Sequence, residues 1–154
     1  MELREFEGRW RLEREIEDLA AGRAGRFVGE AAFAAVAGGL DYAETGTLVL
    51  DGAAPMAASR RYRWIDAGGA AVDVAFEDGR LFHRIDLAAA RPAALHACGP
   101  DLYRVRYDFR DWPRWQAEWR VSGPRKDYAM VSRYLRLHAR VIVEDHTAPC
   151  SPRN

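Results

Sequence analysis

The sequence predicts an all-β fold, an up-and-down antiparallel β-barrel of about ten strands. Charged residues alternate with mostly apolar residues along many short segments, which is the period of two of a half-buried strand. Turn signals such as Gly38-Gly39, Asp78-Gly79 and Gly123-Pro124 separate these segments, and no convincing long helix interrupts them. We therefore expect a single barrel domain over residues 1–142, followed by a polar C-terminal tail over residues 143–154.

Length and charge restrict the class of protein. A chain of 154 residues suits one domain with a sizeable core. Its 23 basic residues balance 23 acidic residues, which argues against a nucleic-acid partner because such binding requires many phosphates to be neutralised. The N-terminus has no apolar region of signal-peptide type, and no apolar run is long enough to span a membrane. We expect a cytoplasmic protein without a membrane partner; the sequence indicates no oligomeric state.

Residues 8–18 show the most regular alternation, with an inward set that is apolar apart from Gly8 and Arg14. Residues 26–37 and 40–50 are predicted to form the next antiparallel pair around Gly38-Gly39. If Ala37 faces Leu40, Phe33 faces Glu44 and Phe27 faces Leu50 on the inward side. The small residues of that face are expected to leave space inside the barrel; they are Gly29, Ala31 and Gly46.

The remaining strands are predicted over residues 60–66, 71–77, 80–86, 94–98, 101–110, 115–121 and 127–137. In the hairpin around Asp78-Gly79, Phe76 would face Leu81 and Val74 would face His83, so that Leu81 and His83 share an apolar face. The outer face of this hairpin would pair Asp73 with Arg84, and Glu77 with Arg80. In the last hairpin, Val121 opposite Tyr128 would set Trp119 against Met130 and Trp115 against Tyr134.

The segment Gly8-Arg9-Trp10 in the first strand resembles the Gly-X-Trp signature of the calycins, which include lipocalins and fatty-acid-binding proteins. The resemblance implies an up-and-down barrel in which this tryptophan closes one end. It also implies that a basic residue of the last strand packs across the indole ring, and Arg136 is the matching candidate. Trp10 and Arg136 are therefore expected to have a structural role in barrel closure.

A second resemblance covers almost the whole chain. The segments that carry it are Phe82-His83, His96-X-Cys98-X-X-Asp101-X-Tyr103 and Trp119-X-Val121-X-Gly123-Pro124-X-Lys126-Asp127-Tyr128. They are similar to a bacterial and fungal domain family of unknown function. This resemblance implies no activity and no cofactor.

The candidate ligand-binding residues are polar or aromatic side chains on predicted inward faces: Arg14, Tyr42, Glu44, Trp64, His83, His96, Tyr103, Tyr107, Trp119 and Tyr128. A buried charge needs a partner, so Arg14 either pairs internally with Glu44 or binds a carboxylate or phosphate. His83 is either a core histidine hydrogen-bonded to a tyrosine or a backbone group, or a pocket residue. The spacing of His83, His96 and Cys98 matches no standard zinc pattern, so we expect no metal.

Arginines and aromatic residues interleave in residues 60–64 and 103–107, as in proteins that bind single-stranded nucleic acid. Strand alternation separates the two sets, however, so we expect the arginines outside and the rings inside. Apolar walls with a few polar groups are typical of small-molecule pockets. The sequence therefore predicts intracellular binding of a small, mostly apolar ligand with a polar or anionic end.

Two alternatives stay open. The first is an enzyme on the same barrel, of isomerase, hydrolase or lyase type, that uses His83 with a tyrosine or glutamate, although no catalytic motif is recognisable. The second is a packed barrel that serves as an interaction module. The identity of any cofactor is not indicated.

Overall fold

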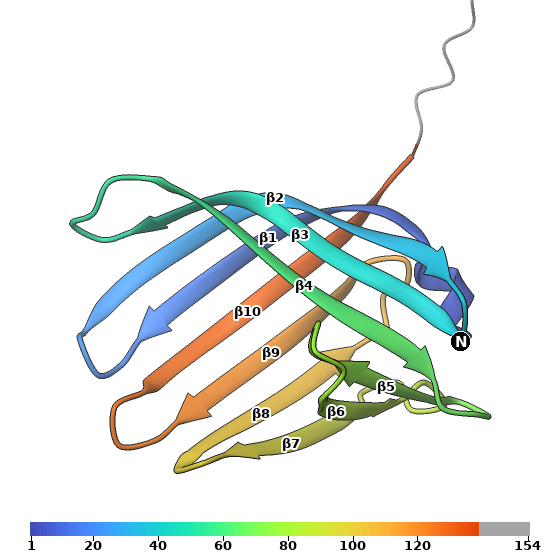
Figure 1. The fold of residues 1–154 in the computed structure, drawn as a ribbon. Helices are drawn as coiled ribbons and strands as arrows, with labels where there is room; N and C mark the ends of the chain where they lie inside the picture. The colour runs from blue at the N-terminus through green and yellow to red at the C-terminus, as the bar shows by residue number, and fades with distance from the viewer. Residues whose placement is uncertain (139–154) are drawn as a thin grey trace, which may run out of the picture.

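The computed structural model describes residues 1–138 and forms one antiparallel sheet of ten strands. A short 3-10 helix, η1 (Leu3–Phe6), precedes the sheet. The strands are β1 (Gly8–Asp18), β2 (Arg23–Val36), β3 (Gly39–Leu50), β4 (Met56–Asp66), β5 (Ala71–Ala75), β6 (Leu81–Asp86), β7 (Ala93–Cys98), β8 (Asp101–Asp108), β9 (Trp115–Ser122) and β10 (Asp127–Leu137). Figure 1 shows them in order.

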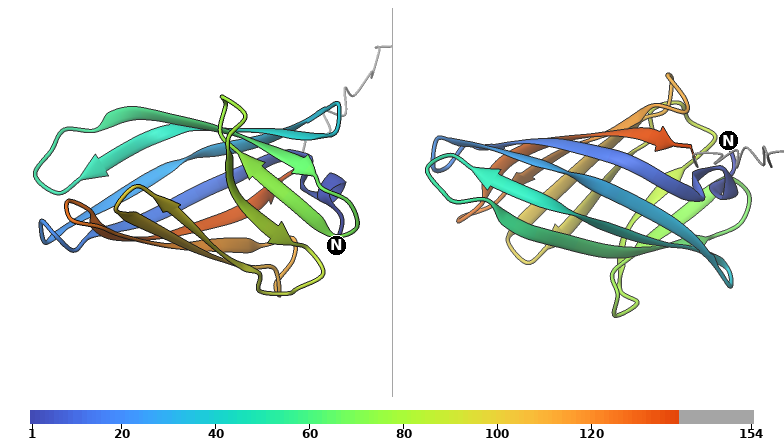
Figure 2. Two further views of the ribbon diagram at one scale, coloured as in Figure 1. Left: turned by 60° about the horizontal axis from the view of Figure 1, so that its bottom comes forward. Right: turned by 90° about the horizontal axis from the view of Figure 1, so that it is seen from above.

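The sheet curls into a nearly closed up-and-down barrel, as the two views in Figure 2 show. Each strand pairs with its neighbour in sequence, and β1 also pairs with β10. At the remaining junction β6 approaches β7, but no ladder joins these two strands within the described residues. This architecture confirms the predicted all-β barrel. The predicted domain end at residue 142 and the tail over residues 143–154 lie outside the described residues.

The hairpin between β2 and β3 has a different register from the predicted one. Val36 pairs with Gly39, and consequently Phe33 faces Tyr42 and Phe27 faces Leu48. The two-residue loop is Ala37-Gly38, with Gly38 at a φ of 77°. Gly39 belongs to β3 and pairs with Ile65 of β4, and a Cβ there would lie 2.0 Å from the Trp64 carbonyl oxygen, so the position requires glycine. The predicted register is wrong by two residues. Because side chains alternate with a period of two, the same residues still face inward.

The small residues of this hairpin do not leave space inside the barrel, contrary to the prediction. Gly29 pairs with Gly46. A Cβ on Gly29 would lie 2.1 Å from the Thr45 carbonyl oxygen, and a Cβ on Gly46 would lie 2.7 Å from the Phe27 ring. These glycines instead permit close backbone approach where the two strands bend, and the Phe27 ring fills the inward side of Gly46.

The hairpin between β5 and β6 contains a bulge between Val74 and Ala75 that the sequence pattern did not indicate. Val74 faces His83 as predicted, but Ala75, and not Phe76, faces Leu81. Leu81 is consequently 55% exposed, although it was predicted to be inward. An extra residue in one strand rotates the neighbouring side chains, and the next residue, Phe82, becomes buried.

Of the two ion pairs predicted for this hairpin, one is confirmed and the other is wrong. Arg84 donates two hydrogen bonds to Asp73, at 2.6 and 2.9 Å. Arg80 pairs with Asp78 at 2.7 Å and does not pair with Glu77. Elsewhere β4 begins at Met56, earlier than predicted, because Met56 already pairs with Leu48. The described residues include no helix long and apolar enough to cross a membrane.

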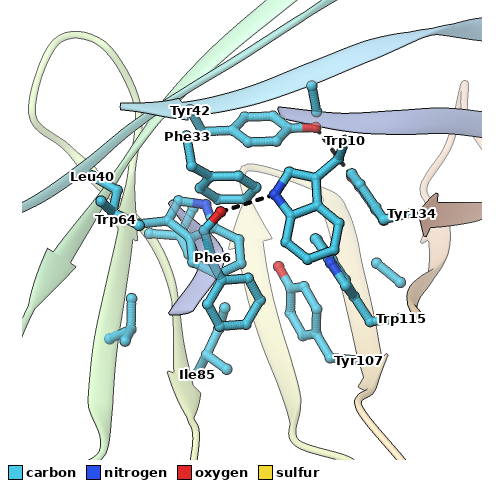
Figure 3. Packing of buried hydrophobic residues seen from close by; sticks show 14 of the residues in the cluster. Phe6, Trp10, Phe33, Leu40, Tyr42, Trp64, Ile85, Tyr107, Trp115 and Tyr134 are labelled. Atoms are coloured by element: carbon cyan, nitrogen blue, oxygen red, sulfur yellow. Dashed lines mark hydrogen bonds between the residues drawn. The ribbon is translucent and has the colours of Figure 1, made fainter. Parts of the chain in front are cut away.

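Trp10 and Arg136 pack together at one end of the β1–β10 pair. The Trp10 Nε1–H donates to the Phe6 carbonyl oxygen at 2.8 Å (Figure 3), and both side chains are fully buried. The Arg136 guanidinium carbon lies 4.2 Å from the Trp10 ring centroid and its Nη1 donates to the Glu7 carbonyl oxygen at 2.8 Å. A Cβ on Gly8 would come within 3.1 Å of that Nη1, so glycine gives the guanidinium room to approach.

Candidate functional site

A pocket of about 380 Å³ lies in the barrel mouth, at the end opposite Trp10. Its walls come from β4, the β5–β6 turn and β6 to β10. The lining side chains are mainly aromatic, with two arginines: Arg60, Tyr62, Phe76, Arg80, Phe82, His96, Cys98, Tyr103, Trp119, Val121, Tyr128 and Met130. The position follows from the register, since Tyr128 lies opposite Asp18, at the far end of β1 from Trp10.

The structure divides the ten predicted ligand-binding residues into two groups. Four of them line the mouth pocket: His96, Tyr103, Trp119 and Tyr128. The other six lie deeper in the barrel and do not line it: Arg14, Tyr42, Glu44, Trp64, His83 and Tyr107. Trp64, for example, is packed against Phe6 and Phe33 in the core, with ring centroids 5.2 and 5.0 Å apart.

Arg14 and Glu44 form a buried ion pair below the pocket. Arg14 donates from Nη1 and Nη2 to the two Glu44 carboxylate oxygens at 2.7 and 2.8 Å, and from Nε to Ser132 Oγ at 2.7 Å. The Tyr42 hydroxyl donates to Glu44 and lies 3.1 Å from the Tyr134 hydroxyl (Figure 3). Of the two alternatives for Arg14, the structure contains the internal pair.

The pKa values in this network follow from burial opposed by pairing. Burial disfavours charge on Arg14 and Glu44, but their hydrogen bonds and opposite charges outweigh it. The pKa of Arg14 is therefore raised and that of Glu44 lowered, and the pair is ionised at neutral pH. Burial, followed by the charge of Glu44 and the neighbouring Tyr134, raises the pKa of Tyr42, which keeps its proton.

Arg60 connects this network with the pocket. Its Nε lies 4.0 Å from Glu44 Oε1, and among the described residues no other carboxylate lies within that distance of Arg60. Glu44 already accepts two hydrogen bonds from Arg14 and one from Tyr42. Two guanidinium groups thus face one carboxylate, which leaves an excess positive charge at the inner wall of the pocket.

His83 forms a second buried polar group. Its Nε2 lies 2.8 Å from the Tyr107 hydroxyl, and the side chain is only 5% exposed. Burial and the nearby His96 lower the pKa of His83 to about 3, so the ring is neutral at physiological pH. The structure therefore contains the hydrogen bond to a tyrosine that the sequence suggested as one alternative. No cluster of three potential metal ligands occurs within residues 1–138.

A larger groove of about 860 Å³ lies on the outer wall, where β1 and β10 meet residues 108–116. Arg11 pairs with Glu13 at 2.5 Å and Arg110 pairs with Asp108 at 2.6 Å, whereas Asp111 and Arg114 form no ion pair within the described residues. The mouth pocket is smaller, but most of its lining is aromatic, and Arg60 faces a carboxylate that Arg14 already engages. We therefore take the mouth pocket as the candidate functional site.

The comparisons with known proteins define the family. A model described as a family of unknown function, DUF6314, matches residues 6–136. The chain belongs to this family. No curated protein matches the DUF6314 chain in sequence.

Among solved structures, this DUF6314 barrel is similar to an S-type phycobiliprotein lyase from Guillardia theta. The TM-score is 0.62, with 91% of this chain and 95% of that chain covered. The sequence identity is 10%, so the likeness extends to the fold alone.

The rim of the DUF6314 pocket carries a further polar cluster. Lys126 Nζ donates to the Tyr103 hydroxyl at 3.0 Å and lies 3.3 Å from Asp101. These two contacts raise the pKa of Lys126, which is therefore charged. Arg80 lies over the Phe76 ring with its guanidinium carbon 5.5 Å from the centroid. Each of these two cations has its own acidic partner, so the rim adds no unpaired positive charge to that of Arg60.

The prediction that the arginines of residues 60–64 lie outside is wrong for Arg60, which lines the pocket. The predicted strand began at Arg60, and Arg60 shares the parity of Tyr62 and Trp64, so alternation places all three on the inward face. Phe82 was missed for a different reason, because the bulge before it breaks the alternation. No local pattern indicates that bulge.

Proposed function

We propose that this DUF6314 barrel binds a small, mostly apolar ligand with an anionic group in the mouth pocket, with Arg60 as the counter-charge. The observation that carries the proposal is an arginine facing an aromatic pocket without a carboxylate of its own. Guanidinium groups bind carboxylates and phosphates through two parallel hydrogen bonds. A volume of about 380 Å³ suits a small organic molecule.

The aromatic walls support a flat apolar body for this ligand. Phe82 lies between Tyr62 and Trp119, with ring centroids 5.7 and 5.2 Å apart and interplanar angles of 2° and 13°. Tyr103 and His96 meet Phe82 edge-on at 5.9 and 5.0 Å. Parallel and edge-on rings of this kind also favour contact with another ring or a conjugated chain.

Arg60, and not Arg14, is the proposed partner of the anionic group. Arg14 is fully engaged by Glu44 and Ser132 and is 7% exposed, whereas Arg60 is exposed to the pocket. The contact of His96, Tyr103, Trp119 and Tyr128 with the ligand stays a prediction. A cytoplasmic location likewise stays a prediction.

The same geometry favours binding over catalysis. His83 contacts Tyr107, but a pKa of about 3 makes it a weak base at neutral pH. Likeness to a phycobiliprotein lyase supports a barrel that handles a small molecule, and it keeps a lyase-type activity as the second candidate. A packed interaction module is less well supported because the mouth contains a pocket. The contacts of Trp10 with Arg136 support a calycin relationship, which we also propose.

The test compares two neighbouring arginines on β4 that face opposite sides of the sheet. Naphthalene-2-carboxylate and naphthalen-2-ylmethanol serve as anionic and neutral probes, measured by titration calorimetry. We expect the wild type and Arg61→Gln to bind the carboxylate about tenfold more tightly, since a charge-assisted hydrogen bond contributes about 1.5–3 kcal/mol. In Arg60→Gln this preference should disappear. Equal binding of the two probes by the wild type would contradict the proposed role of Arg60.

A second measurement identifies the natural ligand. Native mass spectrometry of the protein purified from its own source should show an added mass from an organic anion. A protein that carries no small molecule and binds neither naphthalene probe would contradict the proposed function as a whole.

A further inference from the structure

His83 has a polar atom that the protein leaves unpaired. Its Nε2 lies 2.8 Å from the Tyr107 hydroxyl, whereas no group in residues 1–138 hydrogen-bonds to its Nδ1. The Nδ1 atom is buried, in a side chain that is 5% exposed. A buried polar group without a partner costs about 1–3 kcal/mol of stability, so such an atom calls for a specific reason.

The hydrogen bond to Tyr107 determines which nitrogen carries the proton. Burial raises the pKa of Tyr107, so its hydroxyl keeps a hydrogen, and within the described residues His83 is its only hydrogen-bond partner. If Tyr107 donates to Nε2, the ring proton is on Nδ1 and one donor is unpaired. In the opposite arrangement, the Tyr107 hydrogen and the Nδ1 lone pair lack partners, so each arrangement leaves one donor and one acceptor unpaired. A phenol O–H is a stronger donor than an imidazole N–H, and an imidazole nitrogen is a stronger acceptor than a phenol oxygen. Tyr107 therefore donates to Nε2, and Nδ1 is a hydrogen-bond donor.

The ring that carries this donor packs against two side chains of the mouth pocket. Phe82 and Trp119 line the pocket, and their ring centroids lie 4.7 and 5.4 Å from that of His83. Phe82 and His83 are both on β6, which has a ladder with β5 but none with β7 in the described part of the chain. An edge strand held on one side is easier to displace than a strand paired on both sides.

We infer that His83 is a specificity-determining residue whose Nδ1–H binds a carbonyl-type oxygen of the ligand, reached when Phe82 turns aside. Tyr107 is a positioning residue that holds the proton on Nδ1. A neutral donor favours a neutral acceptor such as a ketone or amide oxygen at this end, while Arg60 takes the anionic end. The inference rests on the proposed function, and it specifies the ligand as a molecule with an acceptor at one end and an anion at the other.

The first test needs no ligand. Long-range proton–nitrogen NMR correlation on the nitrogen-15-labelled full chain distinguishes the two histidine tautomers. We expect the His83 proton on Nδ1 in the wild type, and a mixture of tautomers in Tyr107→Phe, where the hydroxyl that holds Nε2 is absent. A wild-type His83 proton on Nε2 would overturn the inference, whatever the ligand.

The second test uses two probes that differ in one oxygen atom. 6-Propanoylnaphthalene-2-carboxylate carries a ketone, and 6-propylnaphthalene-2-carboxylate is the matched alkyl compound. The wild type should bind the ketone about tenfold more tightly, because it gives the unpaired donor an acceptor. This ratio should fall to about one in His83→Leu and should decrease in Tyr107→Phe. The Nδ1 proton signal should shift when the ketone binds.

The outcomes separate the inference from the proposed function. If the wild type binds both probes equally, the anionic pocket stands and the role of His83 is overturned. If it binds neither probe, the proposed function fails and the inference fails with it. An unchanged ketone preference in a folded His83→Leu protein would also overturn the inference. Should His83→Leu not fold, the tautomer and the wild-type ratio still decide the matter.

Discussion

The end of the barrel that holds Trp10 and the mouth at the opposite end are both rich in aromatic rings, but their arginines are paired differently. At the first end, Trp10 donates to a backbone carbonyl and is covered by Arg136, whose own hydrogen bonds go to backbone carbonyls. At the mouth, Arg60 has no carboxylate of its own, and behind the wall His83 has an unpaired nitrogen. Aromatic content alone therefore does not indicate a binding site. An unpaired polar atom alone does not either, since Trp115 Nε1, close to Trp10, also lacks a partner within the described residues. The mouth differs by having a pocket next to its incompletely paired groups.

The largest expected effect comes from truncating one tryptophan at each end. Trp10→Ala should lower the free energy of unfolding by about 3–5 kcal/mol, because it creates a cavity in a fully buried position. Trp119→Ala, at the half-exposed pocket wall, should cost about 1–2 kcal/mol and chiefly weaken binding of naphthalene-2-carboxylate. Urea denaturation of both variants measures the difference. Equal losses of unfolding free energy would show that Trp119 contributes as much to stability as Trp10, which would contradict this prediction.

The second prediction concerns the ion pair that separates the two ends. Glu44→Leu should destabilise the protein by about 3–5 kcal/mol, because it leaves the Arg14 guanidinium buried without a counter-charge. The double variant Arg14→Met/Glu44→Leu removes both charges and should recover much of that loss. Chemical denaturation of the single and double variants checks this. A double variant less stable than Glu44→Leu would show that the pair itself stabilises the fold.

The third prediction uses pH and has the smallest effect. Unfolded His83 takes up a proton below its ordinary pKa of 6.5, whereas folded His83 stays neutral to a pKa of about 3. The unfolded state therefore binds more protons, and stability falls as pH falls through this interval. Between about pH 6 and about pH 4.5 the wild type should lose about 2 kcal/mol more than His83→Leu.

Parallel slopes for the wild type and His83→Leu would contradict a neutral His83 in the folded protein. Denaturant titrations at several pH values supply the comparison.

The sequence predicted the architecture well because alternation and turn residues are local signals. The bounds of β1 and β10 agree with the predicted 8–18 and 127–137, and Trp10 pairs with Arg136 as expected. The sequence left open whether Arg14 pairs with Glu44, since it does not give the distance across the barrel. The four predicted residues that line the mouth lie on neighbouring strands, β7 to β10. The strand pairing predicted from sequence could therefore suggest that they lie close together.

The remaining parts depended on features without a local signature. The bulge after Val74 buries Phe82 and exposes Leu81, and the backbone approach at Gly39 shifts a hairpin by two residues. Whether the His83 Nδ1 atom has a hydrogen-bond partner depends on the positions of all the side chains around it, so only the three-dimensional structure shows that it is unpaired.

The junction between β6 and β7 has a consequence for how a ligand would enter and leave. Because no backbone ladder joins these strands within residues 1–138, only side-chain contacts hold the wall together there. Parting β1 from β10 would break a ladder along the full length of both strands. The free energy of local opening is therefore separate from that of global unfolding, and the rate of ligand release can change without a change in fold stability.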